Sequence, residues 1–172
     1  MTEFIAGVDR LDEKIDAWWE RIRGRPVLDR LYYTASETAD FSLLWHAFGV
    51  IQAIIEDDPM IAVGVSGALG IESALVNGPI KSLFKRRRPV HDGPRPHTLR
   101  QPRTSSFPSG HASAAMVAAA LLSRHTGGAA WYGVGAIVAT SRIHVRIHHA
   151  SDVAGGIAVG VLLGALARRV LA

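Results

Sequence analysis

The chain has 172 residues, of which 48% are hydrophobic and 20% charged, with a formal net charge of +4 and no cysteine. This length fits one domain, predicted here over residues 1–172, and the lack of cysteine excludes a disulfide framework, a thiolate nucleophile and a cysteine-ligated metal. Eight of the 19 Lys and Arg residues fall within 81–103. Because the positive charge is concentrated there rather than spread over a surface, we expect no nucleic-acid partner.

The first predicted element is an amphipathic helix over Val8–Arg23. Its apolar residues recur at helical spacing: Val8, Leu11, Ile15, Trp18, Trp19 and Ile22. Two adjacent tryptophans suit the level of the lipid headgroups, so we interpret residues 1–26 as a helix lying on the membrane surface. A helix packed on a protein core is the alternative. Gly24 and Pro26 should end this helix.

Five apolar segments follow and predict an all-α membrane bundle of about five transmembrane helices over residues 27–172. Their approximate bounds are Phe41–Ile55, Met60–Ile80, Ala112–Ser123, Ala129–Thr140 and Val153–Leu171. Several are shorter than the ~20 residues that a lone spanning helix needs, so a buried soluble α-bundle is the alternative. The one long connection, residues 81–108, is of the kind that is usually functional or disordered.

Two features inside these segments have more than one interpretation. Gly156, Gly160 and Gly164 follow one another at four-residue spacing, which favours close helix contact within the bundle first and an oligomer interface second. Glu72 lies inside the second segment, where a charge is costly unless it is paired. We interpret it first as a structural partner of a base and second as a substrate contact.

Three polar clusters stand at the ends of these segments: KSLFKRRRP (81–89), PSGH (108–111) and SRIHVRIHHASD (141–152). Because successive spans alternate in direction, all three clusters fall on one side of the membrane and can form one site. With five spans the N-terminus lies on that side too. No cleaved signal peptide is visible, and the basic loop favours the cytoplasmic face of a bacterial plasma membrane.

The clusters contain what a tetrahedral oxyanion needs. Lys81, Arg88 and Arg142 supply positive charge and hydrogen-bond donors. Ser109 and Gly110 stand where a helix begins, and the free N–H groups and the dipole of a helix N-terminus favour an anion.

Two histidines are candidates for the chemistry. His148 and Asp152 are four residues apart and share a face if they lie on a helix, so the carboxylate can fix the imidazole tautomer and leave the other nitrogen as a nucleophile. His111 comes from a different segment and can act as a general acid on the leaving-group side.

This ordered pattern, Lys-x6-Arg-Pro, Pro-Ser-Gly-His and Ser-Arg-x5-His-x3-Asp over residues 81–152, resembles the type 2 phosphatidic acid phosphatase (PAP2) superfamily. The resemblance implies a six-helix bundle with a phosphatase site that needs no metal and no cofactor. It implies that His148 forms a phosphohistidine, that Asp152 orients it and that His111 protonates the leaving oxygen. It implies phosphate contacts from Lys81, Arg88, Ser109, Gly110 and Arg142.

The resemblance also limits the substrate to an amphiphilic phosphate taken from the bilayer. Candidates are phosphatidic acid, phosphatidylglycerophosphate, polyprenyl diphosphates and polyprenyl-linked sugar phosphates, including decaprenylphosphoryl phosphoribose phosphate, with a role in cell-wall biogenesis for the polyprenyl carriers. The small size is typical of bacterial members.

Other interpretations of the same residues stay open. Lys85, Arg86 and Arg87 can form a solvated stretch that holds anionic lipid. His144, His148, His149 and Asp152 could bind a metal, although Arg142 and Arg146 would repel a cation. A vanadate-dependent haloperoxidase has a similar anion site, and a non-enzymatic basic membrane-binding protein would need none of these histidines.

Overall fold

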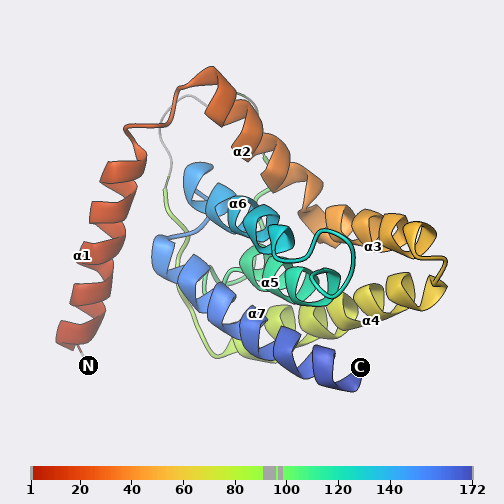
Figure 1. Ribbon diagram of the computed structural model, residues 1–172. Helices are drawn as coiled ribbons and strands as arrows, with labels where there is room; N and C mark the ends of the chain where they lie inside the picture. Colours follow the sequence, from red (N-terminus) through yellow and green to blue (C-terminus); the bar gives the residue numbers. More distant parts are fainter. Residues whose placement is uncertain (1, 91–95, 97–98, 172) are drawn as a thin grey trace.

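Figure 1 shows a computed structural model of the protein. The structure describes residues 2–90, 96 and 99–171. The two ends of the predicted 1–172 domain and part of the long connection therefore lie outside the described residues. Within these ranges every assigned element is helical, as the sequence predicts.

The helices follow one another without a repeat. Their bounds are α1 Thr2–Trp19, α2 Pro26–Thr38, the short 3₁₀ turn η1 Asp40–Ser42, α3 Leu43–Ile55, α4 Pro59–Leu75, the π-helical turn η2 Val76–Ile80, α5 Gly110–Leu122, α6 Ala130–His144 and α7 Ala150–Val170.

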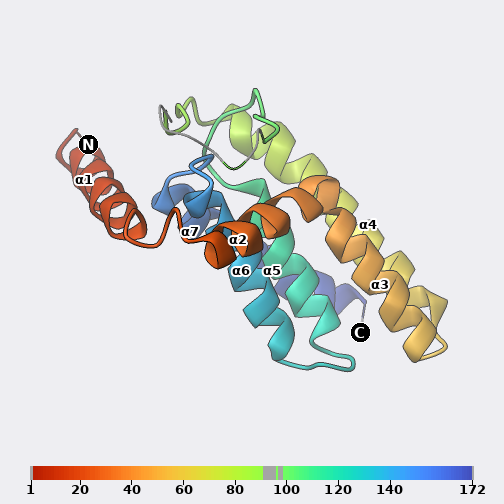
Figure 2. The same ribbon diagram turned by 90° about the horizontal axis from the view of Figure 1, so that it is seen from above.

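Helix α5 forms the centre of the bundle. Its residues from Ala112 to Leu122 are all buried, and the views in Figures 1 and 2 place it among α3, α4, α6 and α7. A helix that is apolar on every side requires such surroundings. Because many of its side chains are those of alanine, neighbouring helices can approach it closely on several faces.

The glycine face of α7 packs against α5. A Cβ added at Gly156 would collide with the carbonyl oxygen of Ser109, and one added at Gly160 would collide with that of Ser113. At Gly164 the nearest atom to such a Cβ is the Cβ of Ala120, at 2.8 Å. This face is therefore occupied within the chain, which is the first of the two interpretations drawn from the sequence.

Two helices are long and apolar enough to cross a membrane: Pro59–Ile80, which joins α4 and η2, and Ala150–Val170. A third candidate is the pair Pro26–Thr38 and Asp40–Ile55, bent by 67°. Helices α5 and α6 have 13 and 15 residues and are shorter than a lone span requires. The described residues thus give two or three candidate spans, and the predicted number of five is not confirmed.

The outer surfaces of α3, α4 and α7 carry large exposed apolar side chains. They include Val50, Ile51, Ile54, Ile55, Met60, Val63, Ile71, Leu162, Leu166 and Val170. A patch of this extent on a water-soluble monomer would be unusual, whereas lipid-facing helices require it. With the candidate spans, it marks an integral membrane protein.

The N-terminal part differs most from its prediction. Pro26 does not end a helix but begins α2 at its first position, where the missing N–H and the fixed φ of proline are tolerated. Helix α1 ends at Trp19, and Gly24 turns the chain with φ 79°. Although Trp18 is exposed, Trp19 is buried and donates from Nε1 to Nδ1 of His144 at 3.0 Å, so α1 is also attached to the protein.

Candidate active site

The first polar cluster begins where α4 unwinds. The π-helical turn η2 contains Pro79, and Gly78 leaves helical geometry with φ −92° and ψ −108°. Proline cannot donate to the helix and disturbs the preceding turn. Lys81 follows this turn, is 6% exposed, and donates from Nζ to Oδ1 of Asn77 at 2.8 Å.

The second cluster places the start of α5 against Lys81. Ser109 is the N-cap residue and Gly110 the first residue of α5. A Cβ at Gly110 would lie 3.7 Å from Nζ of Lys81 and 3.3 Å from Oδ1 of Asn77. The backbone N–H of Ser109 donates to the carbonyl oxygen of Asp152 at 3.0 Å. The helix N-terminus, the lysine and the start of α7 therefore meet.

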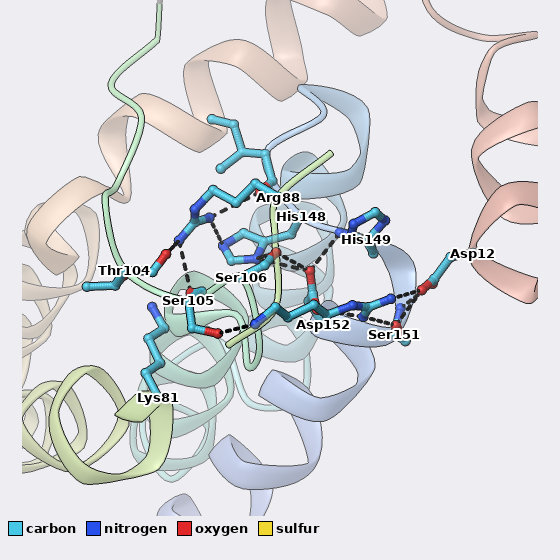
Figure 3. Close-up of polar contacts among 12 residues, drawn as sticks. Asp12, Lys81, Arg88, Thr104, Ser105, Ser106, His148, His149, Ser151 and Asp152 are labelled. Atoms are coloured by element: carbon cyan, nitrogen blue, oxygen red, sulfur yellow. Dashed lines mark hydrogen bonds and ion pairs between the residues drawn. The ribbon is translucent and has the colours of Figure 1, made fainter. Parts of the chain in front are cut away.

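The third cluster holds His148 in the connection just before α7, not on the helix as the four-residue spacing suggested. His149 is the N-cap residue of α7, and its backbone N–H donates to Oδ2 of Asp152 at 2.9 Å. The two expected partners still meet, because Nδ1 of His148 lies 3.5 Å from Oδ2 of Asp152. Figure 3 shows the imidazole of His148 between Arg88 and Asp152.

Arg88 fixes the tautomer of His148. Its Nη1 donates to Nε2 of His148 at 3.0 Å and to the carbonyl oxygen of Ile147 at 3.1 Å. Since a guanidinium has only donors, Nε2 must accept, and the ring proton belongs to Nδ1 on the side of Asp152. The lone pair of Nε2 therefore points to the cationic side of the site, as a nucleophile for a bound anion requires.

His148 is held in its neutral form. Burial, chiefly, and the positive charges of Arg142 and Arg88 lower the pKa of His148 to about 3, against the opposing effect of its bond to Asp152. A neutral imidazole is the form that can attack phosphorus.

Lys81 is also perturbed. Burial, chiefly, and repulsion from Arg88 lower the pKa of the Lys81 ammonium to about 8. Its charge is thus retained at neutral pH but is sensitive to mildly alkaline conditions.

His111 approaches from the start of α5 and meets a carboxylate that the sequence analysis did not identify. Its Nε2 lies 3.0 Å from Oδ1 of Asp40 in the η1 turn. Arg142 of α6 donates from Nη1 to Oγ of Ser36, and its charge acts on both His111 and His148. Arg142 thus lies near both imidazoles.

Several donors of the candidate phosphate-binding residues are buried without a protein partner among the described residues. They are Oγ of Ser109, Nε of Arg88, and Nε and Nη2 of Arg142. Such groups are costly unless a ligand or water satisfies them. All of these atoms can donate a hydrogen bond, and those of the two arginines belong to positively charged groups, so they suit an anionic ligand.

A basic cavity of about 560 Å³ opens beside these residues. It is lined by the cations Lys81, Lys85, Arg86, Arg87, Arg88 and Arg103, together with Ser82, Phe84, Pro102, Thr104 and Ser105. A larger, apolar cavity of about 790 Å³ lies between α4, α5 and α7 and includes Glu72. Neither cavity is lined by His111 or His148, but Lys81 and Arg88 of the candidate phosphate-binding residues line the smaller one.

Three contributors were missed by the sequence analysis. Besides Asp40, Oγ of Ser106 donates to Oδ2 of Asp152, and Arg86 contacts Oδ1 of the same carboxylate at 2.8 Å. The signal for Arg86 was its place two residues before Arg88. In extended backbone, alternate side chains point to the same side, and Lys85 and Arg87 are exposed while Arg86 and Arg88 are not.

The alternative metal site finds no support in the described part of the chain. No group of three His, Asp or Glu side chains there could hold a metal ion. Both ring nitrogens of His144 have protein partners, because Nε2 lies 2.8 Å from Oδ1 of Asp29 and Nδ1 accepts from Trp19.

Comparisons with known proteins find a family match and named relatives. The profile of the PAP2 superfamily matches residues 61–172. Proteins named decaprenylphosphoryl-5-phosphoribose phosphatase, from two strains of Mycobacterium tuberculosis, are 36% identical over 102 residues, which make up 59% of this chain and 57% of each relative. The chain thus spans little more than half the length of these curated relatives.

The fold has a solved counterpart. It is similar to the crystal structure of a transmembrane PAP2-type phosphatidylglycerolphosphate phosphatase from Bacillus subtilis, with a TM-score of 0.72 and 23% identity over 95% of this chain and 86% of that one. At this identity the likeness concerns the fold alone.

Proposed function

The chain belongs to the PAP2 superfamily, and from this membership we propose that it is a membrane phosphatase that hydrolyses a lipid-linked phosphate ester through a phosphohistidine. The observation that carries the proposal is the orientation of His148, whose Nε2 accepts from Arg88 while its Nδ1 faces Asp152. A nucleophile oriented by a carboxylate and placed among cations is the arrangement that phosphoryl transfer to histidine needs.

In the first half of the reaction, Lys81, Arg88, Arg142 and the N-terminus of α5 hold the phosphate oxygens. Nε2 of His148 forms a bond to phosphorus as the bond from phosphorus to the ester oxygen breaks. His111, which takes up a proton when the phosphate dianion is bound, gives this proton to that oxygen, which leaves as the lipid alcohol. Asp152 stabilises the charge that the imidazole of His148 acquires.

In the second half, water attacks the phosphohistidine. His111, now without its proton, takes one from the water, and the bond between phosphorus and Nε2 of His148 breaks. Inorganic phosphate leaves and both histidines return to their starting states. Every step uses side chains of this chain, so we propose that the reaction needs no metal ion.

The proposed substrate is a phosphate ester with a long apolar chain. The apolar cavity between α4, α5 and α7 is lined mainly by aliphatic side chains, including Ile71, Leu75 and Leu163, and suits such a chain. The curated relatives favour a polyprenyl-linked phosphoribose phosphate as the first candidate. Phosphatidic acid, phosphatidylglycerophosphate and polyprenyl diphosphates are the others to compare.

The test is phosphate release from this panel of lipid phosphates by purified protein in EDTA. We expect release from at least one lipid and none by His148→Ala. Acid-labile, base-stable radiolabel on the wild-type protein but not on His148→Ala would identify the phosphohistidine. Activity that persists in His148→Ala, or that EDTA abolishes, would overturn the mechanism. Halide oxidation with added vanadate tests the haloperoxidase alternative.

We further propose that the site faces the cytoplasm. Because the native chain lacks cysteine, single cysteines report sidedness directly. Lys85→Cys lies beside the basic cavity, and Ala129→Cys lies in the exposed turn between α5 and α6, at the opposite end of α5 from Gly110. An impermeant thiol reagent added to intact cells should label Ala129→Cys alone; the reverse pattern places the site outside.

A further inference from the structure

Arg86 connects helix α1 to the carboxylate that faces the nucleophile. Its Nη1 donates to Oδ1 of Asp152 at 2.8 Å and to Oγ of Ser151 at 2.5 Å. Its Nη2 donates to Oδ2 of Asp12 at 2.6 Å and to Oδ1 of Asp9 at 3.2 Å. One guanidinium therefore joins residues of α1 to the first turn of α7.

Asp12 is itself buried at this junction, with 4% of its surface exposed. Its Oδ1 accepts from the backbone N–H of Ser151 at 2.8 Å, and its Oδ2 accepts from Oγ of Ser151 at 2.6 Å. A carboxylate from α1 thus satisfies a free donor at the N-terminus of α7, where the helix dipole favours negative charge. Figure 3 shows Asp12 and Ser151 next to Asp152.

The contacts of Arg86 do not fit a residue that binds lipid headgroups. Lys85 and Arg87 are exposed as such a role requires. Arg86 instead pairs with three carboxylates, and its side chain is 23% exposed. Its charge is already compensated within the protein, so neither an anionic lipid nor the substrate is needed to explain it.

The two oxygens of Asp152 have separate partners. Oδ2 accepts from the backbone N–H of His149 and from Ser106, and faces Nδ1 of His148. Oδ1 is bound by Arg86. Because Asp152 is fully buried, loss of Arg86 would leave Oδ1 without its charged partner and the carboxylate less firmly held, although the donors on Oδ2 keep it on the side of His148.

We propose that Arg86 and Asp12 are positioning residues of the reaction, which hold Asp152 against His148 and make this pair depend on the docking of α1. The inference rests on the proposed function, since it assigns Asp152 the role of orienting the nucleophile. Arg86 bonds to Asp152, whereas the reacting nitrogen of His148 is contacted by Arg88, so Arg86 acts through Asp152. Helix α1 is then an integral part of the active site.

The electrostatic consequence has a definite direction. The charged groups that face His148 are Arg88 from the basic loop, Arg142 from α6 and Asp152 from α7. The positive charge of Arg86 offsets part of the negative potential that Asp152 produces at the imidazole. When Arg86 is replaced by a neutral residue, this offset is lost, so the ring of His148 gains affinity for a proton and titrates at higher pH.

The test compares Arg86→Gln, Arg86→Lys and Asp12→Asn with the control variants Arg10→Gln and Arg21→Gln, whose side chains are exposed on and just after α1. We expect kcat of Arg86→Gln to fall roughly 10- to 100-fold with KM little changed, by analogy with the loss of orienting partners in metal sites. Arg86→Lys should recover part of the loss, and Asp12→Asn should lose less than Arg86→Gln. The double variant Arg86→Gln/Asp12→Asn should have a kcat little lower than that of Arg86→Gln, because both residues act through one contact.

A second readout does not depend on turnover. NMR titration of the ring of His148, assigned with His148→Ala, should give a higher midpoint in Arg86→Gln than in the wild type and no shift in Arg10→Gln. If Arg86→Gln and Arg10→Gln have the same kcat and the same midpoint, the inference is overturned. If Arg86→Gln does not fold, an unchanged kcat and midpoint in Asp12→Asn overturn it equally. Wild-type protein that releases no phosphate refutes the proposed function, while the titration still decides whether Arg86 controls His148.

Discussion

The carboxylate of Asp40 lies 3.0 Å from Nε2 of His111, although α3 and α4 separate the two residues in the chain. Asp40 occupies a turn in which Phe41 and Ser42 adopt left-handed backbone angles, with φ 54° and 60°. Such a conformation costs of order 1–3 kcal/mol per residue other than glycine and tends to occur at functional sites. This strained turn brings a carboxylate to the candidate general acid.

We predict that Asp40→Asn slows the step in which the leaving oxygen takes its proton. General acid catalysis contributes typically ~10²–10⁴-fold, and we expect part of that range to be lost from kcat on a lipid phosphate. The defect should shrink with p-nitrophenyl phosphate, whose leaving group needs no proton. Asp57→Asn, in the α3–α4 turn, is the control. An equal defect on both substrates would show that Asp40 does not act through His111.

Asp152→Asn should reduce phosphate release by roughly 10³-fold or more, by comparison with the loss of the orienting carboxylate in a Ser-His-Asp triad. The amide keeps the shape of the side chain but loses the charge that stabilises the cationic imidazole of His148. Rapid-quench labelling should show slower formation of the phosphohistidine. Normal formation with slow hydrolysis would instead place the main role of Asp152 in the second half of the reaction.

Stability should fall in acid because of His148. Its folded-state pKa of about 3 lies below the ~6.5 of an unfolded histidine, so the unfolded chain binds the proton more readily. The contribution of His148 is fully present above pH ~6.5 and is lost as pH falls toward 3. Thermal unfolding followed by tryptophan fluorescence between pH 7.5 and 4 should show this loss, and His148→Gln should reduce it. If the thermal midpoint falls equally steeply with pH in both proteins, the loss of stability in acid does not come from His148.

Substrate capture should weaken in alkali because of Lys81. With its pKa lowered to about 8 by burial, Lys81 loses its charge above that pH in the free enzyme, and kcat/KM should decline there. In Lys81→Arg, whose charge persists, this alkaline decline of kcat/KM should disappear even if the overall activity is lower. If the decline is identical in both proteins, it comes from another titrating group.

Close packing of α7 on α5 should be sensitive to a single methyl group. Gly156→Ala places a Cβ against the carbonyl oxygen of Ser109, and overpacking of this kind costs typically ~1–3 kcal/mol. Because Ser109 is a candidate phosphate ligand, KM should rise as well. Gly133→Ala is the matched control, since nothing lies within 4 Å of its added Cβ. Equal thermal midpoints for the two variants would contradict the packing.

Local patterns in the sequence predicted much of the fold and the residues of the candidate site. The helical class and the approximate bounds of α4 to α7 followed from apolar runs, and the start of α5 at Gly110 followed from the Ser-Gly pair. The three polar clusters predicted a common site, and in the structure Arg88 contacts His148 while Lys81 lies beside the start of α5, which bonds to Asp152. Their catalytic and binding roles remain predictions.

The missed features depend on tertiary contacts. Helix α2 was overlooked because Pro26 was interpreted as a stop, although proline at the first helical position is favourable. Asp40 lies in a polar stretch without periodicity, and only the bend between α2 and α3 brings it to His111. The partners of Arg86 come from helices far away in the sequence, so the basic run gave no indication that Arg86 would pair with Asp12 and Asp152.

The hydrogen bond from the backbone N–H of Ser109 to the carbonyl oxygen of Asp152 has a consequence for how such a protein can diversify. It ties the segments that present the two histidines together through main-chain atoms, which mutation of side chains leaves in place. Substitutions of residues that line the apolar cavity can therefore change the substrate specificity, while the main-chain bond keeps the two histidine-bearing segments together.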